Sequence, residues 1–263
     1  MKTIVITGAS SGIGAALARH LGREGHNLVL ASRRAATLNA VAHEVQSHVV
    51  TVCTDVTRRN DVNRLCDEAL RAFGNIDVWV NNAGRGISRP VLDLTDGELD
   101  EMMAVNVKSA LYGMQAVVPH FQARGQGHLI NISSFLGRVP IATHRSAYNA
   151  AKAALNALTA NLRVDLAARY PNIHVSLIMP GLVSTEFARN AIGSTSAAAP
   201  PWTPGTSMKA QSAEEVAAAI AGAIERPVAE LYTNPASAPM AQRYFEDVGA
   251  FEANLRAPAP SRA

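Results

Sequence analysis

Short apolar runs alternate with longer stretches of helical periodicity along most of the chain. In the first such stretch, Ile13, Leu17 and Leu21 fall on one face of a helix. Short apolar runs bounded by turn signals predict buried strands, and their alternation with helices indicates right-handed βαβ units in a parallel sheet. Strands are predicted at 3–7, 27–32, 49–53, 77–80, 127–133, 173–179 and 229–233. Helices are predicted at 12–23, 35–46, 60–73, 97–124, 146–170 and 212–226.

Length and composition suit one α/β domain spanning residues 1–263. The formal net charge of +3 is small and scattered, so it predicts neither a nucleic-acid partner nor an anionic membrane. No apolar run reaches transmembrane length and no signal-peptide pattern precedes the first strand, which favours a cytoplasmic protein. Cys53 and Cys66 are expected to be reduced core thiols. Neither the cysteines nor the eight histidines show metal-ligand spacing, so no metal site is predicted.

The first strand passes directly into a glycine-rich turn and then into a helix. Gly8, Gly12 and Gly14 have the spacing G-x-x-x-G-x-G, with the wide gap first, unlike the dinucleotide fingerprint G-x-G-x-x-G. Glycine lets the backbone turn tightly and approach a pyrophosphate, which then rests on the amides of the helix N-terminus. Ser10 and Ser11 would add donors. The turn therefore predicts a nucleotide site.

The end of the second strand indicates which nucleotide is bound. Dinucleotide folds commonly place an acid here that binds the ribose hydroxyls, but this chain has Ser32 and Arg33. A hydroxyl and a guanidinium bind a 2′-phosphate, which a carboxylate would repel. NADP(H) is therefore favoured over NAD(H). We expect Arg33 to bind the phosphate and Arg34 to lie in solvent at the strand end.

Tyr148 and Lys152 lie four residues apart in a predicted helix, so that both side chains share one face. A phenol ordinarily holds its proton to about pH 10. An ammonium beside it favours phenolate, so Lys152 is expected to lower the pKa of Tyr148 towards the working range of a general acid–base.

Further motifs follow in order along residues 2 to about 233. They include Asn81-Asn-Ala-Gly84 after an apolar strand, Ser134 after another, and Pro180-Gly-Leu-Val-Ser-Thr185. With the glycine-rich turn and the Tyr148–Lys152 pair, they resemble the motifs of the short-chain dehydrogenase/reductase superfamily. The resemblance implies a Rossmann-type doubly wound fold, with a mostly parallel seven-stranded sheet and helices on both faces.

The resemblance also implies an NADP(H)-dependent oxidoreductase that interconverts a small-molecule carbonyl and a secondary alcohol by hydride transfer. An alternative is a catalytically silent NADP-binding regulator of the same fold, against which the intact catalytic residues argue. The catalytic residues it implies are Asn106, Ser134, Tyr148 and Lys152. The expected cofactor-binding residues are Gly8, Ser10, Ser11, Gly12, Ile13, Gly14, Ser32, Arg33, Asp55, Val56, Asn82, Ala83, Gly84, Tyr148, Lys152, Pro180, Gly181, Val183 and Thr185.

The spacing between the candidate catalytic serine and Tyr148 departs from the family pattern. Ser134 precedes Tyr148 by one residue more than is usual in the family, so Ser133 is an alternative. Ser134 is favoured because Gly137 follows it three positions on, as a glycine often follows the family's serine. The added residue is expected in the loop 140–145, where His144 is read as facing solvent.

Two segments in the C-terminal third of the chain differ in composition from the predicted strands and helices. Residues 186–211 are rich in small residues and proline, and suggest a substrate lid in which Phe187 and Trp202 either close over a substrate or pack on the body. The tail 234–263 carries aromatic residues that are expected to pack on this subunit or a neighbour, and ends in a mobile stretch. The resemblance implies a homodimer or homotetramer, held partly by the helices at 97–124 and 146–170.

Overall fold

The computed structural model describes residues 1–187, 189–193 and 209–256. In these residues a seven-stranded sheet has the order β3-β2-β1-β4-β5-β6-β7, and every pairing is parallel. This confirms the predicted α/β doubly wound fold. The strands are β1 (Thr3–Thr7), β2 (Asn27–Ser32), β3 (Val49–Cys53), β4 (Val78–Asn81), β5 (Gly127–Ile132), β6 (Ile173–Met179) and β7 (Glu230–Tyr232).

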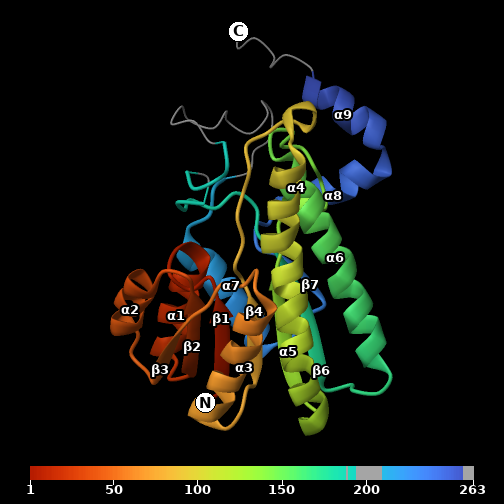
Figure 1. Cartoon of the computed structure of the whole chain (residues 1–263). Helices are drawn as coiled ribbons and strands as arrows, with labels where there is room; N and C mark the ends of the chain where they lie inside the picture. The colour runs from red at the N-terminus through yellow and green to blue at the C-terminus, as the bar shows by residue number, and fades with distance from the viewer. Residues whose placement is uncertain (188, 194–208, 257–263) are drawn as a thin grey trace.

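Helices cover both faces of the sheet (Figure 1). One face packs against α1 (Gly12–Arg23), α2 (Ala35–Glu44) and α7 (Ala213–Glu225). The other packs against α3 (Arg59–Phe73), α5 (Ser109–Arg124) and α6 (Ser146–Ala167). The remaining helices are α4 (Asp96–Met103), α8 (Ser237–Glu246), α9 (Val248–Arg256), the π-helical turn η2 (Ala104–Lys108) and the 3-10 turns η1 (Val91–Asp93) and η3 (Phe135–Gly137).

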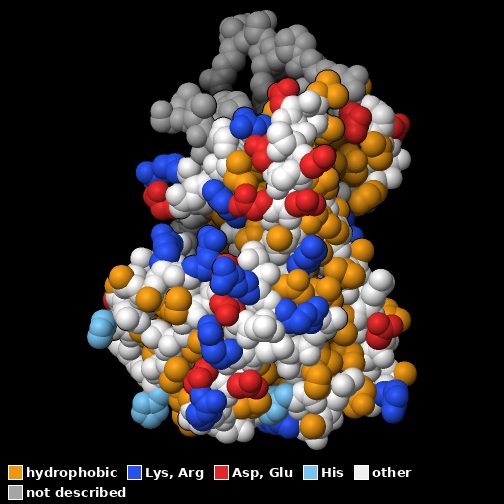
Figure 2. All heavy atoms as spheres, viewed as in Figure 1, with side chains coloured by type: hydrophobic (Ala, Val, Ile, Leu, Met, Phe, Trp, Pro, Cys, Tyr) orange, Lys and Arg blue, Asp and Glu red, His pale blue; other side chains and the backbone are white. Residues whose placement is uncertain are grey.

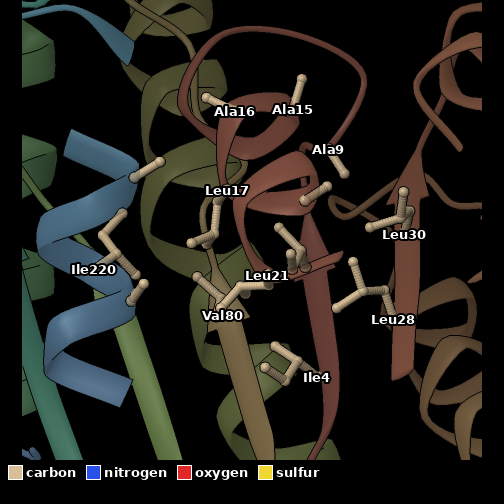
Figure 3. Packing of buried hydrophobic residues seen from close by; sticks show 14 of the residues in the cluster. Ile4, Ala9, Ala15, Ala16, Leu17, Leu21, Leu28, Leu30, Val80 and Ile220 are labelled. Atoms are coloured by element: carbon tan, nitrogen blue, oxygen red, sulfur yellow. The ribbon is translucent and has the colours of Figure 1, made fainter. Parts of the chain in front are cut away.

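Strand side chains alternate between the two cores because successive residues of a strand point to opposite faces. Ile4 and Ile6 join the core under α1 and α7, whereas Val5 joins the core under α3 and α5. In Figure 3, Leu17 and Leu21 of α1 point towards the sheet beside Val80 and Ile4. Both faces of the central strands are thus buried, which explains why they read as continuous apolar runs.

The helix predicted at 97–124 is interrupted. It consists of α4, the turn η2 and α5, and the turn is a π-helix centred on Asn106. The Asn106 side chain donates from Nδ2 to the carbonyl oxygens of Met102, at 3.1 Å, and Arg85, at 2.9 Å. The side chain of Asn106 therefore bonds the Met102 carbonyl, which its backbone amide would bond in a regular α-helix. π-turns inside helices are frequent at functional sites.

The tail is more ordered than the sequence predicts. Within 234–256 it forms α8 and α9, whose apolar side chains Met240, Tyr244 and Phe251 join a third core cluster with Tyr148 and Ile87. The tail aromatics therefore pack on this subunit, although Phe245 remains 61% exposed. The end of the predicted mobile stretch, 257–263, lies outside the described residues.

On the face in Figure 2, basic side chains gather across the middle with acidic ones among them.

Candidate functional site

A cavity of about 980 Å³ opens at the carboxyl ends of the strands. Strand order reverses between β1 and β4, and ligands of open α/β sheets bind at this reversal. Nearly all the predicted site residues line this one cavity. The two that do not are Gly14, which lies beneath the glycine-rich turn, and Asn106, which lies behind Gly84. The predicted residues that line the cavity therefore come from seven separate segments that the fold brings together.

The glycine-rich turn is packed too closely for side chains. Gly8 has a φ of +68°, in the left-handed region that favours glycine, and a Cβ there would lie 2.8 Å from Ala83 Cα. A Cβ on Gly14 would lie 2.5 Å from the carbonyl oxygen of Gly8. The turn therefore keeps its backbone close to the loop after β4 and leaves the amides at the start of α1 facing the cavity, as a bound pyrophosphate requires.

Asn82 and Thr7 hold these two loops together. Asn82 donates from Nδ2 to the carbonyl oxygens of Thr7, at 2.9 Å, and Gly8, at 3.3 Å. The Thr7 hydroxyl accepts from the backbone amides of Asn82, at 3.0 Å, and Ala83, at 3.1 Å. Asn82 thus positions backbone at the cavity, and its amide is occupied by protein carbonyls.

The two arginines after β2 both line the cavity. Arg33 is exposed and lines the cavity. Arg34 is exposed at the strand end, as expected, and its Nη2 also donates to the hydroxyls of Ser10 and Ser11, each at 3.1 Å. The guanidinium therefore reaches back over the glycine-rich turn. Two cations and two hydroxyls meet at this end of the cavity, and Arg34 is the one of these four groups that was not assigned to it from the sequence.

Asp55 also lines the cavity, near enough to Arg33 for the charge of that arginine to act on it. Burial works to raise its pKa, but hydrogen bonds from Thr57 and the charges of Arg33 and Arg58 outweigh this and hold the pKa below its usual value. The carboxylate accepts from the Thr57 amide at 3.0 Å and from the Thr57 hydroxyl at 2.7 Å. It is therefore ionised and fixed in direction at neutral pH.

Tyr148 and Lys152 are both buried near the start of α6. Lys152 Nζ donates to the carbonyl oxygen of Ile132 at 2.8 Å and lies 5.7 Å from the centroid of the Tyr148 ring. Burial lowers the pKa of Lys152 to about 7. Burial also raises the pKa of Tyr148 to about 12, against smaller lowering effects of a hydrogen bond with Ser134 and of the Arg145 charge.

The expectation that Lys152 lowers the pKa of Tyr148 is therefore wrong for this structure of the protein alone. Desolvation disfavours the charged form of each group, so it favours a neutral phenol and an amine that loses its proton easily. The positive charge that reaches the phenol comes instead from Arg145.

The two candidate serines have different surroundings. The Ser133 hydroxyl donates to Oδ1 of Asn156 and to the carbonyl oxygen of Lys152, so it joins β5 to α6. The Ser134 hydroxyl accepts from the Leu136 amide at 3.1 Å and hydrogen-bonds with Tyr148. Ser134 is thus the hydroxyl beside the phenol, as predicted. Gly137 is needed for packing, because a Cβ there would lie 2.7 Å from the Lys152 carbonyl carbon.

Asn106 lies 1% exposed behind the loop after β4. Its Oδ1 accepts from the Arg85 amide at 3.2 Å, and its Nδ2 donates to the carbonyl oxygens of Met102 in α4 and Arg85 in the loop. A Cβ on Gly84 would lie 2.9 Å from Asn106 Oδ1 and 3.6 Å from Lys152 Nζ. Asn106 therefore supports the loop that runs past the lysine.

At the substrate end, Phe187 was expected either to close over a substrate or to pack on the body, Arg145 was given no role of its own, and His144 was misread. Phe187 packs edge-on against Tyr148, with ring centroids 5.5 Å apart. His144 was read as facing solvent, but it is half-buried, lines the cavity and has a pKa lowered by burial. Arg145 also lines the cavity. Only proximity to Tyr148 in the sequence could have indicated these two. Trp202 and most of the proposed lid lie outside the described residues.

Other chemistry is sparse in the described part of the chain. No group of three or more His, Cys, Asp or Glu residues there is arranged to hold a metal ion. None of the described helices is long and apolar enough to cross a membrane. Cys66 is buried, as expected, but Cys53 is exposed at the end of the edge strand β3, so it is not a core thiol.

Comparisons with known proteins agree with the geometry. The family model for short chain dehydrogenases matches residues 2–194. An uncharacterized oxidoreductase of Staphylococcus epidermidis is 36% identical over 184 residues, which covers 70% of this chain and 79% of the relative. Another from Staphylococcus aureus is 40% identical over 185 residues, with the same coverage of each chain.

Two solved structures are similar over most of their length. A short chain dehydrogenase/reductase from Burkholderia phymatum in complex with NAD has a TM-score of 0.82 and 27% identity, and the match covers 100% of this chain and 98% of that one. An alcohol dehydrogenase from the archaeon Thermococcus sibiricus complexed with 5-hydroxy-NADP has a TM-score of 0.74 and 28% identity, with 89% and 96% covered.

Proposed function

Because the chain belongs to the short-chain dehydrogenase/reductase family, we propose that this oxidoreductase interconverts a carbonyl and a secondary alcohol by hydride transfer with NADP(H). The observation that carries the proposal is the buried group of Tyr148, Ser134 and Lys152 in the same cavity as the glycine-rich turn. A proton donor, an oxyanion donor and a nucleotide cradle then meet at one site.

Tyr148 and Ser134 have different roles in reduction of the carbonyl. NADPH, when bound, supplies the hydride that the carbonyl carbon receives. Tyr148 donates its proton to the carbonyl oxygen, and its raised pKa keeps that proton in place until negative charge develops on the oxygen. Ser134 donates a hydrogen bond to the same oxygen and stabilises the developing charge. In the direction of oxidation the same groups work in reverse, and Tyr148 accepts the proton.

Lys152 and Asn106 would serve proton supply and cofactor position. A pKa near 7 lets Lys152 pass a proton to the tyrosinate and recover one from solvent at neutral pH. Lys152 would also bind the nicotinamide ribose hydroxyls. Asn106 would hold a water that connects Lys152 to solvent. Thr185 and the backbone near Val183 would orient the nicotinamide carboxamide and so select the face that delivers hydride.

The contacts to the pyrophosphate and the adenosine part of the cofactor are proposed where the glycine-rich turn and the end of β2 line the cavity. The pyrophosphate would rest on Ser10, Ser11 and the first amides of α1, where the close packing of Gly8 leaves no side chain in the way. Asp55 would accept hydrogen bonds from the adenine, and Val56 would contact the ring. Ser32 and Arg33 would bind the 2′-phosphate, and Arg34 adds a second positive charge nearby. This charge supports NADP(H) over NAD(H).

The replacement Tyr148→Phe tests the function. The replacement removes the proposed proton donor and should reduce turnover by about 10²–10⁴-fold, read as NADPH absorbance across ketones, aldehydes and β-ketoacyl thioesters. NADPH binding, measured by fluorescence, should remain near wild type. Turnover above about a tenth of wild type in the variant would remove Tyr148 from its role. A wild type that binds NADPH but turns over no substrate would favour the silent regulator.

A further inference from the structure

Arg145 is a half-buried cation beside the catalytic tyrosine. It is the N-cap residue of α6, three positions before Tyr148, and lines the cavity at its substrate end. Its Nη1 donates to the carbonyl oxygen of Ile87 at 3.0 Å. Nη1 of Arg145 and Cε1 of Phe187 lie 3.1 and 2.9 Å from the position of a Cβ on Gly86. The guanidinium and the phenyl ring therefore both pack against the Gly86 backbone, and the phenyl ring also packs against the ring of Tyr148.

The charge of Arg145 has no carboxylate partner among the described residues. The other arginines near this end of the cavity are paired, since Arg85 bonds Glu101, Arg89 bonds Glu98 at 2.9 Å, and Arg189 bonds Glu186 at 2.5 Å. The residues outside the description, 188, 194–208 and 257–263, include no Asp or Glu. The side chains of this protein therefore offer Arg145 no counter-ion wherever those segments lie.

An unpaired guanidinium in a partly desolvated wall is costly unless something compensates it. Burial lowers the pKa of Arg145, but a guanidinium starts so high that it stays charged at neutral pH. Among the described residues, one of its five N–H donors is used, in the bond to Ile87, so a planar pair of donors is available for a ligand. His144, the neighbouring base, has a pKa lowered by burial and is neutral at pH 7.

We propose, building on the hydride-transfer function above, that Arg145 binds a carboxylate of the substrate, which is therefore an oxo acid in reduction and a hydroxy acid in oxidation. Arg145 is then the residue that selects substrates. The carbonyl oxygen lies at Tyr148 and Ser134, and the carboxylate lies on the cavity side of the Arg145 guanidinium, whose Nη1 is held by the Ile87 carbonyl.

The surroundings favour a carboxylate over other anions. A guanidinium binds a carboxylate through two parallel hydrogen bonds, which fixes orientation as well as charge. A phosphate monoester carries about −1.5 to −2 charges at neutral pH, and Arg145 supplies one. Phe187 and the apolar residues Leu136, Ile141 and Ala142 on the wall suit the carbon chain between the two polar groups. A neutral thioester would leave the guanidinium without a partner.

The test compares matched substrates in the full-length protein. Acetoacetate, levulinate and 2-oxobutanoate are each assayed against their methyl esters, with dihydroxyacetone phosphate as the phosphate arm. Wild type should show a higher kcat/KM on at least one acid than on its ester. Arg145→Gln should lower kcat/KM for that acid by about 10–100-fold, as expected for a charge-assisted hydrogen bond, and leave the ester within about threefold.

Controls separate recognition from other effects of the charge. Arg89→Gln removes a nearby arginine that is already paired, and should leave the ratio of acid to ester unchanged. Arg145→Lys keeps the charge without the planar donors, and should recover part of the preference. An equal loss on acid and ester in Arg145→Gln would mean that Arg145 acts through the pKa of Tyr148, and would overturn the proposal. An Arg145-dependent preference for the phosphate arm would overturn its carboxylate part.

If the enzyme reduces none of these compounds, that result counts against the proposed function for oxo acids and their esters. Binding of the acids to the protein with NADP⁺ is then measured by calorimetry. Tighter binding to wild type than to Arg145→Gln would support the carboxylate site independently of turnover. Equal binding to both proteins would overturn it.

Discussion

Burial sets the protonation of the two ionisable groups at the centre of the site. It raises the pKa of Tyr148 to about 12 and lowers that of Lys152 to about 7. Desolvation disfavours charge on each side chain. Sequence spacing identified both residues but gave the wrong direction for the tyrosine, because adjacency on a helix face does not report how much water reaches either group.

The lysine should make the stability of the cofactor-free protein depend on pH. Its folded pKa of about 7 lies below the unfolded value of about 10.4, so between these values the unfolded state binds more protons. Stability therefore rises with pH in this window, by at most about 1.4 kcal/mol per pH unit. The opposite effect of Tyr148, a loss of stability as pH rises, falls between about pH 10 and 12.

Urea unfolding from pH 7 to 9.5 measures this effect. The free energy of unfolding of wild type relative to Lys152→Met should increase with pH. The same difference for Lys108→Met, an exposed lysine, should stay flat. A flat difference for Lys152 as well would show that its amine is solvated in the folded protein.

Alanine replacements of the two neighbouring serines should have different effects, one on catalysis and the other on stability. Ser134→Ala removes the hydroxyl beside the phenol and should cost roughly 10²–10³-fold in kcat. Ser133→Ala removes a bond between β5 and α6, so it should reduce stability by about 1 kcal/mol and change kcat little. Steady-state kinetics and urea unfolding on both variants decide this, and a larger kcat loss from Ser133→Ala would reverse the assignment.

The choice of cofactor depends on residues at the end of β2. Ser32→Asp with Arg33→Ala removes an attraction for the 2′-phosphate and adds a repulsion, so NAD⁺ should then bind more tightly than NADP⁺. In wild type the preference for NADP⁺ should be about ten- to hundredfold, and smaller at high salt. Dissociation constants of both cofactors at moderate salt measure this. Equal affinities in wild type would return Arg33 to a solvated strand end.

At the scale of elements, hydrophobic pattern located the sheet and its covering helices to within a few residues. Buried parallel strands leave a strong pattern because both of their faces are apolar. The pattern did not reveal the π-turn, which forms because Asn106 bonds the Met102 and Arg85 carbonyls. It also missed α8 and α9, whose apolar residues gain their packing from Ile87 and Phe135, distant in the sequence.

Part of the candidate site was predictable from the sequence, as part of the fold was. Motifs at strand ends identified the cavity residues, because the carboxyl ends of parallel strands share one edge of the sheet. Arg145 carried no motif, and its bond to Ile87 joins residues 58 positions apart. Contacts of that kind depend on the loops, and loop conformation follows from tertiary packing more than from local periodicity.

Two glycines in helices should respond oppositely to alanine. Gly14→Ala places a methyl 2.5 Å from the Gly8 carbonyl oxygen, so it should destabilise the protein by roughly 1–3 kcal/mol and weaken NADP⁺ binding. Gly222→Ala in α7 meets no atom within 4 Å and should stabilise by about 0.5–1 kcal/mol. Urea unfolding measures both, and an unchanged Gly14→Ala would mean that the turn is looser than its packing indicates.

At the scale of the whole molecule, α6 presents a stripe of small residues to solvent. Ala150, Ala153 and Ala157 are exposed at helical spacing, and Val164 continues the line at 73% exposure. Figure 1 shows α6 along one side of the molecule, where another subunit has access to its outer face. Small side chains allow two helices to approach closely, and an exposed apolar stripe favours a partner.

We therefore predict a homodimer or homotetramer in which α6 packs against its counterpart. Light scattering at micromolar concentration should give at least twice the 27.8 kDa of the chain. Ala153→Glu should lower that mass, because an isologous interface would bring two like charges together without partners. Ala40→Glu, on the exposed face of α2, should leave the mass unchanged. A wild-type monomer would contradict the prediction, whereas an oligomer insensitive to Ala153→Glu would move the interface to another face.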